Sequence, residues 1–349
     1  MEFVQDSIPM VFVAAAAAAL YARASSSVLR PGFPRLVALL PLFPFLVAAP
    51  LAFTSSAIIR ATVAFFLAWL CAFKLALLAA GRGPLDPALP VLTFLFTALL
   101  PVKLRQRRGG AGAGAAASTK ASKPDLSLVS CAVKAAVIAV ILRLYQFNSR
   151  LHLYVRLAMY GVHIYCFLDL FFPCIALAVG ALGMETEPQF DRPYLASSLR
   201  DFWGRRWNLM VSAILRPSVY DPVRARAGNP AGVLATFLVS GLMHEGMVYY
   251  LSLRRPNGGM TAFFLLHGVC CVAEGWCARR WTARGLPSPP QAVATLLVVL
   301  FVAATSFWLF FPPLCKDGVE EKLLEEWAAV AAFFLDAGKK ITWYGQRGN

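Results

Sequence analysis

The stretch that decides the fold class is residues 231–251, AGVLATFLVSGLMHEGMVYYL. It matches the ~20 residues that a helix needs to cross a hydrocarbon core. The run is continuously apolar and lacks the alternation of a barrel strand, so it predicts a transmembrane helix. Apart from tyrosines, the run contains two ionisable side chains, His244 and Glu245.

Eight further runs have the same apolar character. In a chain of 349 residues that is 59% hydrophobic and 15% charged, they predict an all-α, multi-pass integral membrane bundle of about nine spans. One run contains Pro41, Pro44 and Pro50, and is predicted to be kinked or split into two short segments. The eight further runs are residues 8–22, 34–53, 57–80, 88–102, 128–145, 157–182, 261–277 and 292–311.

The net charge of +15 raises the possibility of a nucleic acid partner. However, the basic residues cluster in loops between the apolar runs, where they suit anionic lipid headgroups. We therefore expect the lipid bilayer, and no nucleic acid, as a partner. The eight cysteines form no CxxC pair, so neither a metal site nor a disulfide framework is predicted. Nothing in the sequence indicates an oligomeric state.

The composition divides the chain into four parts. N-terminal transmembrane helices (1–105) precede a flexible, basic Gly/Ala-rich loop (106–124). A membrane core (125–315) and a C-terminal amphipathic tail (316–349) follow. Within the tail, residues 319–334 predict an amphipathic helix with Glu320 and Glu321 in its first turn, where carboxylates suit the helix dipole.

A second amphipathic helix is predicted over residues 199–215, lying in the membrane interface. One interpretation is a peripheral anchor with a solvated polar face. The other is that Asn208 faces a reaction chamber while Arg205 and Arg206 bind an anionic substrate group, such as the phosphates of coenzyme A. The predicted polar stripe is Asp201, Arg205, Asn208 and Ser212, and the apolar side includes Trp203 and Trp207.

An ionisable side chain near the middle of a span is unfavourable by ~3 kcal/mol, so His244 indicates function. Ser240 lies one turn earlier and is expected to orient its ring. Glu245 points about 100° away, and is expected to contact another helix or an arginine. His267, His163 and Asp169 either line the same cavity or form interhelical hydrogen bonds.

Three segments resemble the plant wax synthase family, the long-chain-alcohol O-fatty-acyltransferases of the membrane-bound O-acyltransferase superfamily. They are EPQFDRPYLASSLRDFWGRRWNLMVSAILRPSVYDPV (187–223), SGLMHEGMVYYL (240–251) and FFLLHGVCCVAE (263–274). The resemblance implies an MBOAT-like fold, residence in the endoplasmic reticulum and wax ester synthesis from acyl-CoA as co-substrate and a long-chain alcohol or sterol, without a cofactor.

By this resemblance His244 matches the catalytic histidine and Asn208 its polar companion. Ester synthesis needs a base at the alcohol proton and a dry cavity, and neutral imidazole can serve as that base. We expect His244 to take the alcohol proton during direct attack on acyl-CoA, with Asn208 binding the carbonyl or oxyanion. The other substrate-binding candidates are Arg205, Arg206, Trp203, Trp207, Ser240, Glu245 and His267.

Other functions stay open at this point. The acceptor could be a sterol, a triterpene alcohol or a diacylglycerol. A lipid or proton-coupled transporter would use His244, Glu245 and Asp169 as a relay, and a scaffold would use them as interhelical contacts. The sequence contains no G-x-S-x-G elbow, P-loop, dinucleotide fingerprint or H-H-x-x-x-D-G motif. The enzyme classes that depend on these motifs, including the wax ester synthases that use H-H-x-x-x-D-G, are therefore excluded.

Overall fold

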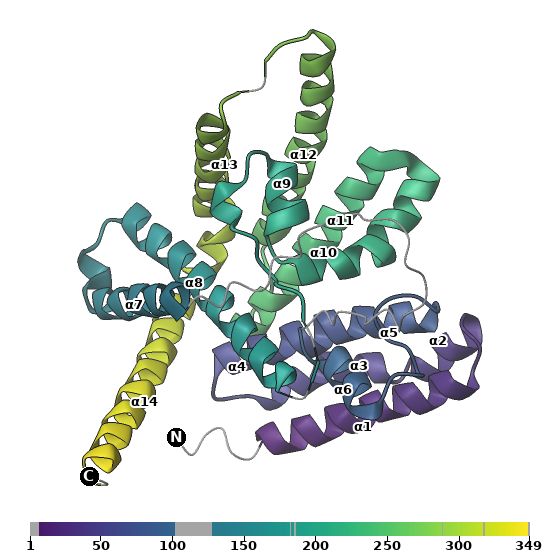
Figure 1. Ribbon diagram of the computed structural model, residues 1–349, viewed down its shortest axis with the longest axis horizontal. Helices are drawn as coiled ribbons and strands as arrows, with labels where there is room; N and C mark the ends of the chain where they lie inside the picture. Colours follow the sequence, from purple (N-terminus) through teal and green to yellow (C-terminus); the bar gives the residue numbers. More distant parts are fainter. Residues whose placement is uncertain are drawn as a thin grey trace, which may run out of the picture.

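The computed structural model describes residues 7–101, 128–181, 183–184, 186–287, 289–316 and 318–347. Within these ranges, eight helical stretches are long and apolar enough to cross a membrane (Figure 1). This confirms the predicted all-helical, multi-pass membrane architecture. The eight stretches are Ile8–Val28, Phe33–Ala52, Ala57–Ala79, Val129–Arg150, Leu153–Gly180, Leu209–Ser252, Gly259–Ala283 and Gln291–Phe310. The predicted loop at 106–124 lies outside the described residues.

The prediction of a span at residues 88–102 is wrong. In this run the structure forms only α6, Val91–Leu99, which has 9 residues. At 1.5 Å per residue such a helix covers about 14 Å, less than half of the hydrocarbon core. The Nζ of Lys74 is fully buried and donates to the carbonyls of Thr97 and Leu100, at 2.6 Å and 2.8 Å. The end of α6 is thus held inside the protein.

The proline-containing run is split, as predicted. It forms α2 (Phe33–Leu39), α3 (Leu42–Ala48) and the 3-10 helix η2 (Ala49–Ala52). Pro41 is the N-cap of α3 and Pro50 lies in the first turn of η2. Prolines are tolerated at these positions because the first N–H groups of a helix have no intrahelical partner.

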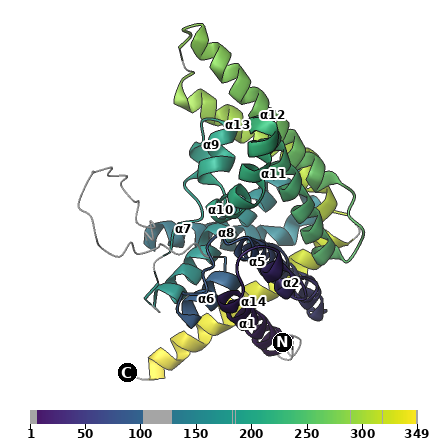
Figure 2. The ribbon, with the colours of Figure 1, turned by 90° about the vertical axis from the view of Figure 1, so that its right-hand side faces the viewer.

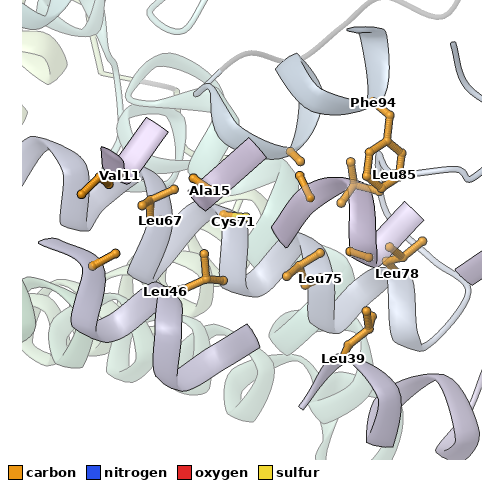
Figure 3. Close-up of a cluster of buried hydrophobic side chains, with 14 of the residues drawn as sticks. Val11, Ala15, Leu39, Leu46, Leu67, Cys71, Leu75, Leu78, Leu85 and Phe94 are labelled. Atoms are coloured by element: carbon orange, nitrogen blue, oxygen red, sulfur yellow. The ribbon is translucent and has the colours of Figure 1, made fainter. Parts of the chain in front are cut away.

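The N-terminal helices pack around one apolar core (Figure 3). Its side chains come from α1 (Ser7–Val28), α2, α3, α6, the π-helix η3 (Phe65–Cys71) and α5 (Ala72–Ala79). The helix α4 (Ala57–Ala64) continues directly into η3 and α5. Figure 3 labels Val11, Ala15, Leu39, Leu46, Leu67, Cys71, Leu75, Leu78, Leu85 and Phe94 in this core.

The C-terminal part contains the long helices. α11 and α12 pack closely: a Cβ on Gly241 would lie 2.8 Å from the Cα of Thr261, and one on Gly268 would lie 2.9 Å from the Cβ of Phe237. Within α11 the backbone is non-helical at Gly228 (φ 85°), so the span proper begins near the predicted residue 231. The elements are α7 (Leu128–Leu144), η4 (Tyr145–Arg150), α8 (Leu153–Gly180), η5 (Pro193–Leu195), η7 (Arg216–Tyr220), α11 (Asp221–Ser252), α12 (Gly259–Ala283), α13 (Gln291–Thr305), η8 (Ser306–Phe310) and η9 (Pro312–Leu314).

The prediction of one continuous interfacial helix over 199–215 is wrong. The segment forms α9 (Leu199–Asp201), the π-helix η6 (Phe202–Arg206) and α10 (Leu209–Leu215), with an extended Trp207 and a left-handed Asn208 between η6 and α10. Gln189 satisfies the freed backbone: its carbonyl accepts from Leu209 N and its side chain from Met210 N. Contacts distant in sequence therefore override the helical period, and a single polar stripe does not form.

The predicted amphipathic helix in the C-terminal tail is confirmed, and it is longer than expected. It is α14, Val319–Arg347, with Glu320 and Glu321 in its first turn. Both views show its C-terminal end projecting from the rest of the molecule (Figures 1 and 2). At its other end, Glu326 binds the N-terminus of α4.

Candidate active site

His244 lies in the membrane-spanning part of α11. Its Nδ1 is 2.7 Å from the backbone carbonyl of Ser240, one turn earlier. Because a carbonyl can only accept, Nδ1 carries the proton and the neutral ring keeps its lone pair on Nε2. Ser240 thus orients the ring through its carbonyl oxygen, leaving Nε2 as the basic atom.

Aromatic rings surround His244. The ring of Phe264 in α12 is 4.2 Å away, centroid to centroid. Trp69 in η3 lies 5.1 Å away with its ring plane tilted by 75°, and Phe310 in η8 lies 6.3 Å away. Aromatic side chains from three other elements therefore surround the half-buried imidazole.

Glu245 faces another helix, as expected from its angle to His244. It is 7% exposed, and its Oε1 accepts from Thr261 N in the first turn of α12 at 3.0 Å. A carboxylate at a helix N-terminus is favourable for the helix dipole. Glu245 therefore joins α11 to α12, and this contact fixes the height of Phe264 beside His244.

Asn208 is the N-cap of α10 and adopts φ 44°, ψ 66°. Asparagine tolerates this left-handed region better than most residues. Its Oδ1 accepts a long hydrogen bond of 3.4 Å from Val211 N. The helix that follows packs through Met210 and Ile214 in one buried cluster with Leu70 of η3, and η3 is also the element that brings Trp69 to His244.

The two arginines of the FWGRRWN motif have different surroundings. Arg206 is held by Asp201, with Nε 2.7 Å from Oδ2, and donates to the backbone carbonyl of Asp191. The Arg205 side chain is 80% exposed and its Nε lies 4.0 Å from Asp201. Arg206 therefore holds the local loop, whereas the Arg205 guanidinium is accessible to an anionic group.

Trp203 and His267 form a buried hydrogen-bond chain. The Trp203 indole donates to His267 Nδ1 at 3.0 Å, and His267 Nε2 lies 2.9 Å from Thr305 Oγ1 in α13. His267 is fully buried. Both ring nitrogens are thus occupied by side chains of η6 and α13, which is the interhelical role that the sequence left open.

The remaining sequence candidates also make contacts between helices. Asp169 in α8 forms an ion pair with Lys134 of α7 at 2.8 Å, and accepts from Tyr165. His163 Nδ1 lies 2.7 Å from the Tyr145 hydroxyl. Trp207 packs against the rings of Phe190, Phe202 and Tyr165.

Two surface grooves lie elsewhere. One, of about 720 Å³, runs along α13 and is lined by Arg206, Gln291 and Thr295 together with apolar side chains. The other, of about 530 Å³, lies between α7 and α8. Neither is lined by His244, so the predicted dry chamber beside His244 is not among them. Within the described ranges, no three His, Cys, Asp or Glu side chains are arranged to hold a metal ion.

Comparison with known proteins shows the family to which the chain belongs. A profile of the membrane bound O-acyl transferase family matches residues 186–266. Acyl-CoA–sterol O-acyltransferase 1 of Arabidopsis thaliana is 38% identical over 90% of this chain and 92% of its own length. Long-chain-alcohol O-fatty-acyltransferase of Simmondsia chinensis is 38% identical over 91% of this chain and 92% of its own. The chain belongs to the membrane bound O-acyl transferase family. A third relative, probable long-chain-alcohol O-fatty-acyltransferase 1 of Arabidopsis thaliana, is 39% identical over 95% of this acyltransferase and 96% of its own length.

Sequence reasoning missed the three aromatic neighbours of His244 in this acyltransferase. Trp69 lies far outside the matched segment 186–266, in an apolar run where a tryptophan resembles any other core residue. Phe264 lies inside the segment, and its helical spacing to His267 placed it on α12 without indicating its partner. The feature of the sequence that could have indicated Trp69 is its residue type, because an indole N–H is a hydrogen-bond donor inside an apolar span.

Proposed function

We propose that this acyltransferase transfers a fatty acyl group from acyl-CoA to the hydroxyl of a long-chain alcohol, producing a wax ester. The observation that carries the proposal is His244, a neutral imidazole with a fixed tautomer at membrane depth, inside the segment matched by the family. The names of two relatives, the long-chain-alcohol O-fatty-acyltransferases of Arabidopsis and Simmondsia, supply the acceptor.

In the proposed mechanism, the alcohol oxygen attacks the thioester carbonyl carbon while Nε2 of His244 takes the hydroxyl proton. The C–O bond forms, the C–S bond breaks, and the proton passes to the departing sulfur, giving an ester and free coenzyme A. His244 thereby returns to its neutral form. No covalent enzyme intermediate, metal or other cofactor is required.

Asn208 is proposed to donate from its side-chain amide to the carbonyl oxygen of the thioester as negative charge develops there. Its Oδ1 accepts from Val211 N, so the amide group is oriented with its oxygen toward α10. Donors aimed at a developing oxyanion contribute far more in a site without water than in water. Trp207, directly before Asn208, packs in the aromatic cluster that fixes this turn.

Arg205 is proposed to bind phosphates of coenzyme A, because its guanidinium is the exposed member of the arginine pair. Arg206 supports it by holding Asp201 and the loop. The acyl chain and the alcohol then approach His244 through apolar surroundings, which requires Phe264 or Phe310 to move from their present contacts with the ring.

A sterol is the second candidate acceptor. It is favoured by the 38% identity to acyl-CoA–sterol O-acyltransferase 1 over 90% of the chain. Support for a transporter is weaker, because Asp169 is paired with Lys134 while His244 binds its own helix and Glu245 binds the start of α12. We also propose that the enzyme resides in the endoplasmic reticulum and that the four parts of the chain are those given by the sequence.

The test is an acceptor panel. Microsomes containing the protein receive labelled acyl-CoA with fatty alcohols, sterols, triterpene alcohols or diacylglycerol. We expect wax ester as the main product, and His244→Ala should lower its rate at least about a hundredfold at equal protein abundance. His152→Ala, at an exposed histidine, is the matched control. If sterol ester is the main product, the acceptor is a sterol and not a long-chain alcohol. If no ester forms with any alcohol, the proposed acyltransferase function is wrong.

A further inference from the structure

Trp69 carries a buried hydrogen-bond donor with no acceptor among the described residues. Its side chain is 3% exposed, and Nε1 has no hydrogen-bond partner there. Buried donors are almost always paired in folded proteins, and the requirement is stricter at membrane depth, where no bulk water is available. Such an unpaired donor is available to an acceptor atom on a bound ligand.

The position of Trp69 indicates which ligand. The ring lies 5.1 Å from that of His244, with the two planes at 75°. The residue before it, Ala68, packs against the apolar cluster that contains Tyr250 of α11. The residue after it, Leu70, belongs to the apolar cluster that contains Met210 of α10. Trp69 thus occupies the element between the helix that carries the base and the helix that Asn208 caps.

The local backbone also favours a functional position. Residues Phe65–Cys71 form a π-helix between α4 and α5. Single π-helical turns inside α-helices are rare and are frequent at functional sites, because the wider turn displaces side chains from their regular positions. Here the widened turn contains the residue that contacts the catalytic histidine.

We infer that the indole N–H of Trp69 donates a hydrogen bond to the carbonyl oxygen of the bound acyl thioester. This inference rests on the proposed function. As the alcohol oxygen attacks, the C=O electron pair moves onto this oxygen, and Trp69 and Asn208 together stabilise the charge. The charge returns to re-form C=O when the C–S bond breaks and the proton on His244 passes to sulfur.

The test separates the N–H from the ring. Trp69→Phe keeps an aromatic ring and removes the donor. Trp308→Phe is the matched control, because Trp308 also lies in a π-helix, η8, but is 70% exposed. For Trp69→Phe we expect a fall in kcat of about ten- to a hundredfold, with the KM for the alcohol close to wild type. Trp308→Phe should keep the wild-type kcat.

Two unreactive coenzyme A thioethers provide a second readout. One bears a ketone near the thioester carbonyl position, and the other bears a simple alkyl chain. Trp69→Phe should weaken binding of the ketone about tenfold, roughly the effect of one hydrogen bond, and leave binding of the alkyl thioether unchanged. Equal affinities for the variant and the wild type, or equal losses for both analogues, would overturn the inference by assigning Trp69 a packing role.

Failure of folding is monitored separately. If Trp69→Phe does not accumulate as folded protein, Trp69→His supplies a ring N–H in a smaller side chain. Retention of the ketone preference in Trp69→His supports the inference, and its loss with the fold intact contradicts it. Ester synthesis by the wild-type protein tests the proposed function itself, so the two failures are distinguishable.

Discussion

The guanidinium of Arg60, in α4, donates from Nε to the backbone carbonyl of Tyr250, near the end of α11. It also donates to the carbonyls of Leu251 and Phe53, and the side chain is only 2% exposed. Helix C-terminal carbonyls lack intrahelical partners, so a cation there satisfies them and suits the helix dipole. Since Tyr250 follows His244 by less than two turns, this contact anchors the helix that carries His244 to the N-terminal bundle.

Replacing this cation tests the anchor. Arg60→Met should destabilise the protein by about 2–4 kcal/mol, because buried carbonyls lose a charged donor. Thermal unfolding of the detergent-solubilised protein measures the change, and Arg30→Met, at an exposed position, is the control. An unfolding temperature equal to that of the control would show that α11 does not depend on Arg60.

The N-terminus of α4 is held by α14. Glu326 accepts from Ser56 Oγ and from the backbone N–H groups of Ala57 and Ile58, at 2.7–2.9 Å. Glu326→Ala should cost about 1–2 kcal/mol, as loss of an N-terminal capping group does elsewhere. Glu325→Ala, at the exposed neighbouring position, should cost less than about 0.5 kcal/mol. Equal melting temperatures for the two variants would remove this role from Glu326.

Glu320 makes the stability of the α14 contact dependent on pH. Burial acts to raise its pKa, but hydrogen bonds from Tyr160, Asn148 and Arg156 outweigh burial and hold the pKa below its usual value of 4.5. A carboxyl whose pKa is lower in the folded state stabilises that state above the unfolded pKa, and this contribution is lost as the pH falls through the folded pKa.

The stability difference between wild type and Glu320→Gln should therefore be largest near pH 7 and shrink below about pH 4.5. Melting temperatures of both proteins across this range measure it, with the exposed Glu321→Gln as control. A difference that stays constant with pH, or that grows on acidification, would contradict the assignment.

The spans could be predicted because each apolar run must satisfy its own backbone in lipid, which leaves only a helix. His244 and Glu245 could be selected as candidate site residues for a related reason, because placing an ionisable group in such a run is energetically unfavourable. The same signal was present at Arg60 and Lys74, inside the run at 57–80, and there it marked structural contacts with helix ends.

The turn at Asn208 could not be predicted from helical periodicity. It depends on Gln189, which binds the first N–H groups of α10 from outside the segment. The contact between Trp69 and His244 was equally inaccessible, because it joins two spans far apart in sequence. The sequence shows which side chains are energetically unfavourable to bury in a span. Which of these side chains contact each other depends on how the helices pack.

The hydrogen-bond chain through His267 predicts a structural role. Thr305→Val removes the oxygen that faces His267 Nε2 and should destabilise the protein by about 1–3 kcal/mol, leaving a buried N–H unpaired. The kcat and KM per folded enzyme should stay at wild-type values. Thr282→Val, at an exposed threonine of α12, is the control. An increase in KM at unchanged stability would instead place His267 in the substrate site.

Asn208 allows its backbone role and its amide chemistry to be separated. Asn208→Gly removes the amide but adopts φ 44° without strain, so the melting temperature should stay close to wild type. The kcat for ester synthesis should fall about 10²–10³-fold, the usual effect of losing one oxyanion donor. Asn208→Leu is the matched comparison, because it removes the amide and also strains the turn; it should lower both kcat and stability. If Asn208→Gly kept the wild-type rate, the residue would serve only to turn the chain from η6 into α10, and the oxyanion contact would have to come from another donor.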